Sequence, residues 1–207
     1  MNFKLEWKKI FICFAAVTGM GFFLSFLILC NLGTDPCTFM NRSIAARLCM
    51  TFGNLQLIVN ISILIVVFLI KKSLIGFGTL FNMILIGYYA DFFCWLWKKT
   101  IPDQAFTTPI GRWSIFFAAL ICFVFSAAIY INVDMGVSPY DALPVIITDK
   151  VTKKYPAFPK TLIRILYDGS AIIIGMLVGG VPVVGIVLMA LFLGPVITLV
   201  KKMFTKM

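Results

Sequence analysis

The sequence predicts an all-α integral membrane protein whose six transmembrane helices form two inverted three-helix repeats. Three observations lead to this fold class. First, 61% of the 207 residues are hydrophobic and 13% are charged, and the mean hydropathy is +1.04. Second, six stretches of the chain are long and apolar enough to span a bilayer. Third, two short patterns of the first half recur in the second half at nearly the same spacing.

The composition indicates that lipid, rather than water, surrounds most of the chain. A soluble core needs a polar shell, and 13% charged residues cannot cover a body of this size. The net charge of +10 would suit nucleic acid, but the 18 basic residues form short clusters beside apolar runs. Such clusters are typical of topology determinants. We therefore expect the lipid bilayer, and no nucleic acid, as a partner.

The chain offers few groups for cofactor or catalytic chemistry. It has no histidine, and its six cysteines include no C-x-x-C pair. The usual ligands of zinc, haem and iron–sulfur clusters are therefore missing. The sequence also has no nucleophile in a recognisable pairing with a base. We expect no cofactor, no metal site and no enzymatic activity.

The predicted spans follow from helix length, because a bilayer core of about 30 Å requires about 20 apolar residues. They are 10–30, 52–70, 74–97, 113–133, 158–178 and 181–203. The first is too long for the apolar core of a signal peptide and is predicted to be an uncleaved helix. Two leftover segments, 34–50 and 137–157, are too polar to span. We predict that each forms an interfacial or re-entrant helix.

The positions of lysine and arginine predict the orientation, because basic loops stay in the cytoplasm. With the N-terminus inside, twelve basic residues fall on the cytoplasmic side and five on the outer side. The cytoplasmic group is Lys4, Lys8, Lys9, Lys71, Lys72, Lys150, Lys153, Lys154, Lys160, Lys201, Lys202 and Lys206. The outer group is Arg42, Arg47, Lys98, Lys99 and Arg112. Both termini are therefore predicted to be cytoplasmic.

An internal repeat is visible in two places. Asn-Leu-Gly-Thr-Asp-Pro at 31–36 returns as Asp-Met-Gly-Val-Ser-Pro at 134–139, a shift of 103 positions. The second match, with a shift of 107 positions, relates Gly78 and Gly87 to Gly185 and Gly194. We predict a first repeat over 1–100 and a second over 101–207, together forming one membrane domain. Each repeat holds three spans, an odd number, so the second must be inverted, as in many secondary transporters.

The repeated motif predicts a helix break followed by a new helix. A glycine in the left-handed conformation ends the first span, and an N-cap with proline behind it starts a short helix. Ser138 and Asp141 also have the spacing of a capping box. The predicted break residues are Gly33, Asp35, Pro36, Gly136, Ser138, Pro139 and Asp141. Residue counting places both breaks near the membrane interfaces, as gates or anion-attracting helix starts, or as plain structural joints.

Polar residues inside the predicted spans mark a candidate site. Arg164 and Asp168 are four apart and share a helix face, and charges in a span usually face a partner or a cavity. Asn60 lies at mid-span in the first half and maps onto Tyr167. The candidate substrate-binding residues are Asn60, Arg164, Tyr167, Asp168, Gln56 and Asn82. The alternative is a structural hydrogen-bond network between helices.

Three motifs carry a family resemblance. They are Leu-Gly-Thr-x-Pro after the first span, Met-Gly-x-Ser-Pro-x-Asp after the fourth, and Gly-Ile-Val-x-x-x-Leu-x-Leu-Gly-Pro near the end. Over nearly its whole length the chain resembles bacterial membrane proteins of the YczE/YyaS/YitT type. The first motif departs from the pattern with Asp35 in place of serine, and with Cys37-Thr38 where the second has Tyr140-Asp141. The resemblance implies a multi-pass protein of the bacterial plasma membrane.

The leading functional hypothesis is a small secondary transporter or permease for an unidentified solute, bound between the two repeats. A second hypothesis is a substrate-binding membrane subunit of a multi-component transporter. A third is a structural or regulatory membrane protein that transports nothing. The sequence leaves open whether the chain forms a homodimer or needs an unknown partner subunit.

Overall fold

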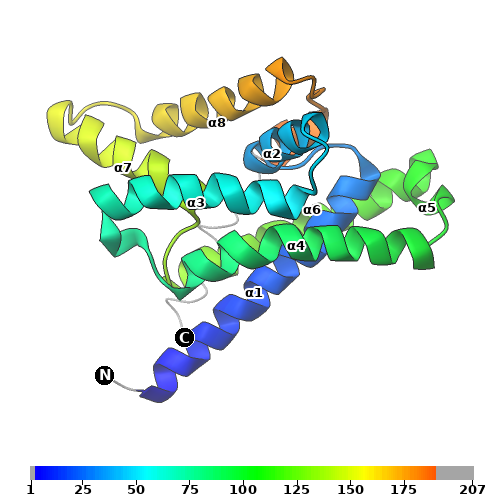
Figure 1. Cartoon of the computed structure of the whole chain (residues 1–207), viewed down its shortest axis with the longest axis horizontal. Helices are drawn as coiled ribbons and strands as arrows, with labels where there is room; N and C mark the ends of the chain where they lie inside the picture. The colour runs from blue at the N-terminus through cyan, green and yellow to red at the C-terminus, as the bar shows by residue number, and fades with distance from the viewer. Residues whose placement is uncertain (1–2, 190–207) are drawn as a thin grey trace.

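The computed structural model describes residues 3–189, and every regular element in this range is helical (Figure 1). The elements are α1 (Phe3–Cys30), α2 (Pro36–Arg47), α3 (Phe52–Ile70), the 3-10 turn η1 (Lys72–Leu74), α4 (Phe77–Thr100), α5 (Gln104–Thr107), α6 (Pro109–Asn132), α7 (Pro139–Lys154) and α8 (Lys160–Leu177). Residues 184–189 begin a further helix.

The predicted spans and short helices correspond closely to these elements. The span predicted over 52–70 has the bounds of α3, and α1, α4, α6 and α8 match four others. The two segments judged too polar to span form α2 and α7. Most of the sixth predicted span, 181–203, lies outside the described residues, as do Gly194 and the three lysines near the C-terminus.

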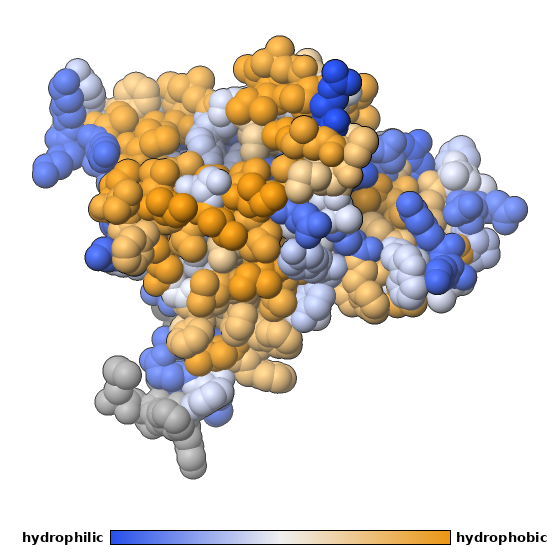
Figure 2. Space-filling view, in the orientation of Figure 1, coloured by the Kyte–Doolittle hydropathy of each residue, from blue (hydrophilic) through white to orange (hydrophobic). Residues whose placement is uncertain are grey.

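Four of the described helices are long and apolar enough to cross a membrane: α1 from Glu6, α3, α4 and α6. Helix α8 is 18 residues long, but it carries Lys160, Arg164 and Asp168. The space-filling view shows a broad hydrophobic surface between hydrophilic groups at opposite ends (Figure 2). Large apolar side chains such as Leu69, Ile110 and Leu177 are more than three-quarters exposed. A surface of this kind is suited to lipid.

Helix α1 forms the centre of the fold, because it packs along both α4 and α6. Leu24, Phe116 and Val124 are fully buried in the core between these helices. Helices α1 and α6 are antiparallel. Arg112, near the start of α6, donates from Nε to the carbonyl of Cys30 at the end of α1, over 2.6 Å.

The two short helices pack in a crossed pattern. Helix α2 lies against α8, and α7 lies against α3 (Figure 1). The approach of α2 to the end of α8 is close. A Cβ added to Gly175 would lie 2.6 Å from the ring of Phe39, and one added to Gly180 would lie 2.1 Å from Ser43 Oγ. In the chain, α3 follows α2 and α8 follows α7. The packing is therefore exchanged: α2 packs on α8, and α7 packs on α3.

The two predicted helix breaks have the same backbone geometry. The first residue with left-handed φ after α1 is Asn31 (49°), and the first after α6 is Asp134 (56°), which follows the C-cap Val133. The sequence interpretation expected this conformation at Gly33 and Gly136, and both glycines do have positive φ, but Asn31 and Asp134 lie nearer the helix ends. Asn and Asp tolerate the left-handed conformation because their short polar side chains bond locally. The glycines follow two residues later, also with positive φ, of 128° and 99°.

The glycines allow two close backbone contacts. Gly78 N–H donates to the carbonyl of Met135 over 2.7 Å, and Gly185 N–H donates to the carbonyl of Leu32 over 2.8 Å. The first contact lies beside Gly136 and the second beside Gly33. A Cβ on Gly33 would lie 2.6 Å from Gly185 Cα, and one on Gly136 would lie 2.5 Å from the Gly76 nitrogen. Only glycine fits at such separations.

Candidate functional site

Both short helices begin with a capped turn. Asp35 is the N-cap of α2, and its Oδ1 accepts from Thr38 N–H over 3.0 Å. Ser138 is the N-cap of α7, where its Oγ accepts from Asp141 N–H over 3.1 Å. Pro36 and Pro139 occupy the first helical positions. The Ser138 hydroxyl also donates to Asp141 Oδ2 over 2.6 Å, so the cap fixes the orientation of that carboxylate.

A three-residue ion cluster joins the start of α7 to the face of α8. Arg164 donates from Nη1 to Asp141 Oδ1 and from Nε to Asp168 Oδ2, each over 2.7 Å. The side chains are 40% exposed for Arg164, 33% for Asp141 and 18% for Asp168. The pairing of Arg164 with Asp168 was expected from their spacing. The third member, Asp141, was predicted only as a helix-break residue.

Two tyrosines complete the cluster. Tyr140 donates its hydroxyl to Asp168 Oδ1 over 2.9 Å, so both oxygens of that carboxylate are bonded. Tyr167 donates to the carbonyl of Tyr140 over 3.0 Å, and the two rings lie 4.7 Å apart. Burial raises the pKa of the Tyr140 phenol, which therefore stays a neutral donor at physiological pH.

The start of α2 lies beside this cluster. Cys37 and Met40 pack with Tyr140, Tyr167 and Ala171 in one apolar group. The two short helices therefore start close together next to α8, rather than apart at opposite interfaces as residue counting suggested. Residue counting assumed that each short helix starts at the membrane depth where the preceding long helix ends. The non-helical linkers 31–35 and 133–138 instead have five and six residues, enough to cover about 17 Å and about 20 Å when extended.

The charges in this region do not balance. Asp35, Asp141 and Asp168 supply three carboxylates, whereas Arg164 supplies one positive charge. Burial raises the pKa of the Asp35 carboxyl, and the nearby negative charge of Asp141 adds to the rise. The bond from Thr38 opposes this rise. The two helix N-termini contribute partial positive charge to the same place.

The remaining predicted residues form a second group of buried polar side chains. Gln56 and Asn60 are buried on α3, and Asn82 is buried on α4. Within the described residues none of the three has a hydrogen bond to the ion cluster, so the structure does not join all six candidates. Gln56 Oε1 has no partner there, and neither does Asn41 Oδ1 on α2.

Sequence reasoning missed three residues of this region. Tyr140 and Cys37 occupy equivalent positions, each directly after the helix-starting proline. Asn41 follows Cys37 by one helical turn and donates to its Sγ over 3.6 Å. The repeat itself was the available signal, because it aligns Cys37 with Tyr140. The packing of Cys37 of α2 with Tyr140 of α7 is a tertiary contact, and aligning the two repeats does not predict it.

Chemically, the arrangement suits recognition of a polar solute rather than bond-making. A guanidinium held between two carboxylates, with two phenol groups beside them, offers both donors and acceptors. Between residues 3 and 189 no three His, Cys, Asp or Glu side chains converge in a way that could hold a metal ion. The site is thus a polar, charged and partly exposed region at the start of α7 and on α8.

The helical fold and its apolar surface define the class: this is a multi-pass helical membrane protein. Within that class, the chain belongs to the family described as "Family of unknown function (DUF6198)", whose model matches residues 7–202. An uncharacterized protein of Haemophilus influenzae is 25% identical over 192 residues, 93% of this chain and 83% of the relative. The uncharacterized membrane protein YczE of Bacillus subtilis is 27% identical over 119 residues, 58% of this chain and 53% of that protein.

The match to YczE confirms the family resemblance inferred from the three sequence motifs. No solved structure matches the chain.

Proposed function

We propose that this protein is a small secondary transporter or permease that binds a small polar solute between two inverted repeats. One observation carries the proposal. The capped starts of α2 and α7, one from each half of the chain, meet at an ion cluster on α8. Secondary transporters built from inverted repeats bind their substrates between the repeats, where interrupted helices end. The amide oxygens of Asn41 on α2 and Gln56 on α3, which accept no hydrogen bond in the described part of the chain, add unused polar capacity.

The proposed inverted repeat is supported by paired contacts. The hydrogen bond from Gly78 to Met135 and the one from Gly185 to Leu32 are related by the shifts found in the sequence. The crossed packing of α2 on α8 and of α7 on α3 has the reciprocity that a two-fold relation requires. Three spans in each half would then relate the halves by an axis in the membrane plane.

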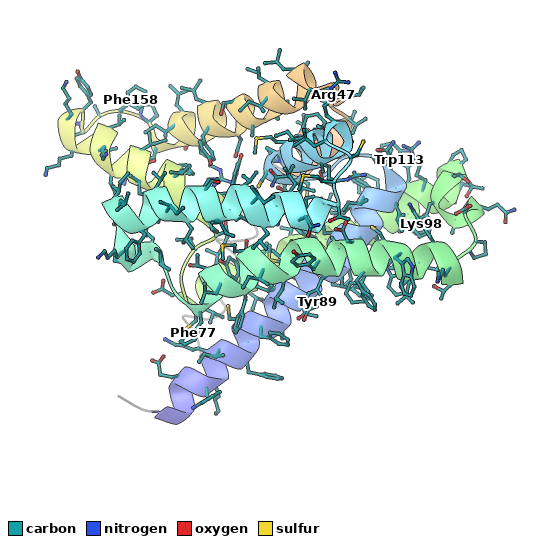
Figure 3. All side chains as sticks on the ribbon, viewed as in Figure 1. Arg47, Phe77, Tyr89, Lys98, Trp113 and Phe158 are labelled. Atoms are coloured by element: carbon teal, nitrogen blue, oxygen red, sulfur yellow. The ribbon has the colours of Figure 1, made fainter. Side chains whose placement is uncertain are left out.

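The proposed orientation places both termini in the cytoplasm. Arg47, Lys98 and Trp113 lie at one end of the molecule, and Phe77 and Phe158 lie at the other (Figure 3). In a variant without native cysteines, Lys98→Cys should react with an impermeant maleimide on intact cells. Lys153→Cys should react only after permeabilisation. The reverse pattern would invert the topology.

Uptake by complemented cells tests the transport proposal. A bacterium lacking the gene is compared with the same strain carrying the wild type, and the metabolites that differ between cells and medium are measured. Asp168→Asn should abolish the wild-type difference while leaving a folded protein in detergent. The matched control is Asp149→Asn, because Asp149 pairs with Lys71 on the surface, away from the cluster, and it should behave as the wild type.

The double variant Arg164→Leu with Asp168→Ile removes both charges on α8 at once. If this variant folds and still restores the metabolite difference completely, the cluster is a replaceable packing feature and the site proposal is wrong. Dependence on a second, co-purifying membrane protein would instead favour the substrate-binding subunit of a multi-component transporter. We propose no enzymatic role, because the cluster pairs no nucleophile with a base.

A further inference from the structure

A cavity lies apart from the ion cluster, between the end of α1, α2 and the turn that follows α8. Its volume is about 260 Å³, well above the space that a single water molecule needs. Asn31 and Thr34 of the first helix break line one side, and Arg42 and Arg47 of α2 line another. Apolar side chains, Phe39 among them, and glycines form most of the rest. We call this the α2 cavity.

The two arginines of the α2 cavity are unusual within this protein. The chain has four arginines. Arg164 has two carboxylate partners, and Arg112 donates to the carbonyls of Cys30 and Asn31. Arg42 and Arg47, by contrast, make no hydrogen bond or ion pair with any residue in the described part of the chain. Both unpaired guanidiniums thus face the same cavity.

No carboxylate neutralises the α2 cavity. The chain contains eight acidic residues, all within the described range, and none lines the cavity. Asp91 is the acid that interacts with Arg42, but beyond ion-pair distance, and its Oδ2 accepts from Gly53 N–H over 2.7 Å. Asp35 caps the opposite end of α2. Leaving a half-buried guanidinium such as Arg42 unpaired is costly, unless a ligand supplies the negative charge.

We propose that the α2 cavity binds a phosphate-type anion through Arg42 and Arg47. The planar guanidinium presents a fork of donors that matches phosphate oxygens. Arg47 lies at the same end of the molecule as Lys98 (Figure 3), where the headgroups of a bilayer crossed by the four apolar helices would be. The anion is therefore either the phosphate of an anionic lipid, whose acyl chains would lie against the apolar wall, or a free phosphate. This inference is independent of the proposed transport function.

Binding to the full-length protein in neutral detergent tests the proposal. Phosphatidylglycerol and diacylglycerol are added separately, and the lipid retained is counted by native mass spectrometry. Inorganic phosphate is titrated in parallel by calorimetry. We expect the wild type to bind phosphatidylglycerol at least tenfold better than diacylglycerol, or to bind inorganic phosphate. The first result identifies a lipid as the source, and the second a free anion.

The variants separate the α2 cavity from general surface charge. Arg42→Gln with Arg47→Gln should weaken binding at least tenfold. Lys98→Gln with Lys99→Gln, which removes the same charge from the same end, should leave binding unchanged. If the arginine pair fails to fold without Arg42, Arg47→Gln alone should still weaken binding severalfold, because Arg47 is exposed and its loss is tolerable. Wild type that binds neither probe, or equal losses in the arginine and lysine variants, would overturn the proposal.

Discussion

The two helix breaks have similar backbone conformations but different side chains. Each has a left-handed Asn or Asp, a positive-φ glycine, a polar N-cap and a proline, in the same order. The residues that follow differ: Cys37 and Thr38 in the first half, Tyr140 and Asp141 in the second. The long helices differ in the same way, because Leu57 and Ile61 of α3 stand where α8 has Arg164 and Asp168.

This difference teaches that the scaffold is duplicated while the ion cluster is not. Backbone geometry at the breaks depends on glycine and on left-handed residues, and both halves retain them. The charges of the ion cluster depend on side chains that can differ between the halves without altering the backbone. They lie on α7 and α8 of the second half. Variants at the glycines should therefore affect both halves alike, and variants at the charges should affect one.

The largest effect is expected from the break glycines. Gly33→Ala and Gly136→Ala should each cost about 3 kcal/mol of unfolding free energy, roughly 1 for left-handed strain and 2 for overpacking. In both cases the new Cβ would lie less than 3 Å from backbone atoms, which cannot move aside cheaply. Unfolding in mixed micelles with increasing SDS measures the change.

Gly169→Ala provides the control for this comparison. Gly169 lies inside α8 with no atom within 4 Å of an added Cβ, so alanine should stabilise the protein by up to about 1 kcal/mol through helix propensity. A neutral Gly33→Ala alongside a costly Gly136→Ala would show that the two breaks are not structurally equivalent.

A smaller effect is expected from breaking the ion cluster. Arg164→Leu leaves the carboxylates of Asp141 and Asp168 without their shared cation. It should cost about 2 kcal/mol, between the values for exposed and buried pairs, because Arg164 is 40% exposed. Adding Asp168→Ile converts this face of α8 to the residues of α3 and should recover at least half of that loss. Unfolding of the double variant measures the recovery, and a further loss would contradict the comparison.

The long helices and both short ones could be predicted from sequence because they depend on local information. Apolar runs fixed the bounds of α3, and proline after a polar N-cap marked the starts of α2 and α7. The pairing of Arg164 with Asp168 is also local, since residues four apart share a helix face. The proposed inverted arrangement rests on the repeat and on counting spans.

What could not be predicted depends on contacts between distant segments. The approach of Asp141 to Arg164 requires the start of α7 to lie beside α8, and the linker geometry decides this. The left-handed conformation of Asn31 and Asp134 was missed because glycine is the usual choice, and Gly33 and Gly136 with their positive φ account for only part of each break. The crowding at Gly33 arises from Gly185, far along the chain, and has no local signature.

The helix caps should give effects of about 1 kcal/mol. Asp35→Ala and Ser138→Ala each remove an acceptor for a backbone N–H. Ser138→Ala should cost more of the two, because Ser138 also holds the carboxylate that Arg164 binds. Thermal unfolding of both variants, compared with Asp35→Asn, which keeps the acceptor, measures the difference. Equal losses of stability would mean that the two caps contribute equally, and that the bond from Ser138 to Asp141 adds nothing.

The smallest effect concerns the charge of Asp35, and it appears as a dependence on pH. Burial raises the pKa of Asp35 above its ordinary value, so the folded protein holds this proton more tightly than the unfolded chain. The stabilisation from the bound proton is fully present below about pH 4, the ordinary aspartate value, and it is lost as pH rises through the folded pKa. Asp35→Asn keeps the cap and cannot ionise.

The difference in melting temperature between the wild type and Asp35→Asn should therefore change across this window. The wild type should lose stability relative to the variant as pH rises from about 4, and the difference should level off once Asp35 is ionised in both states. A wild type that instead gains stability relative to Asp35→Asn over this range would mean that the partial positive charges of the helix starts outweigh burial. The first break would then hold its carboxylate as an anion, as the second break holds Asp141 against Arg164.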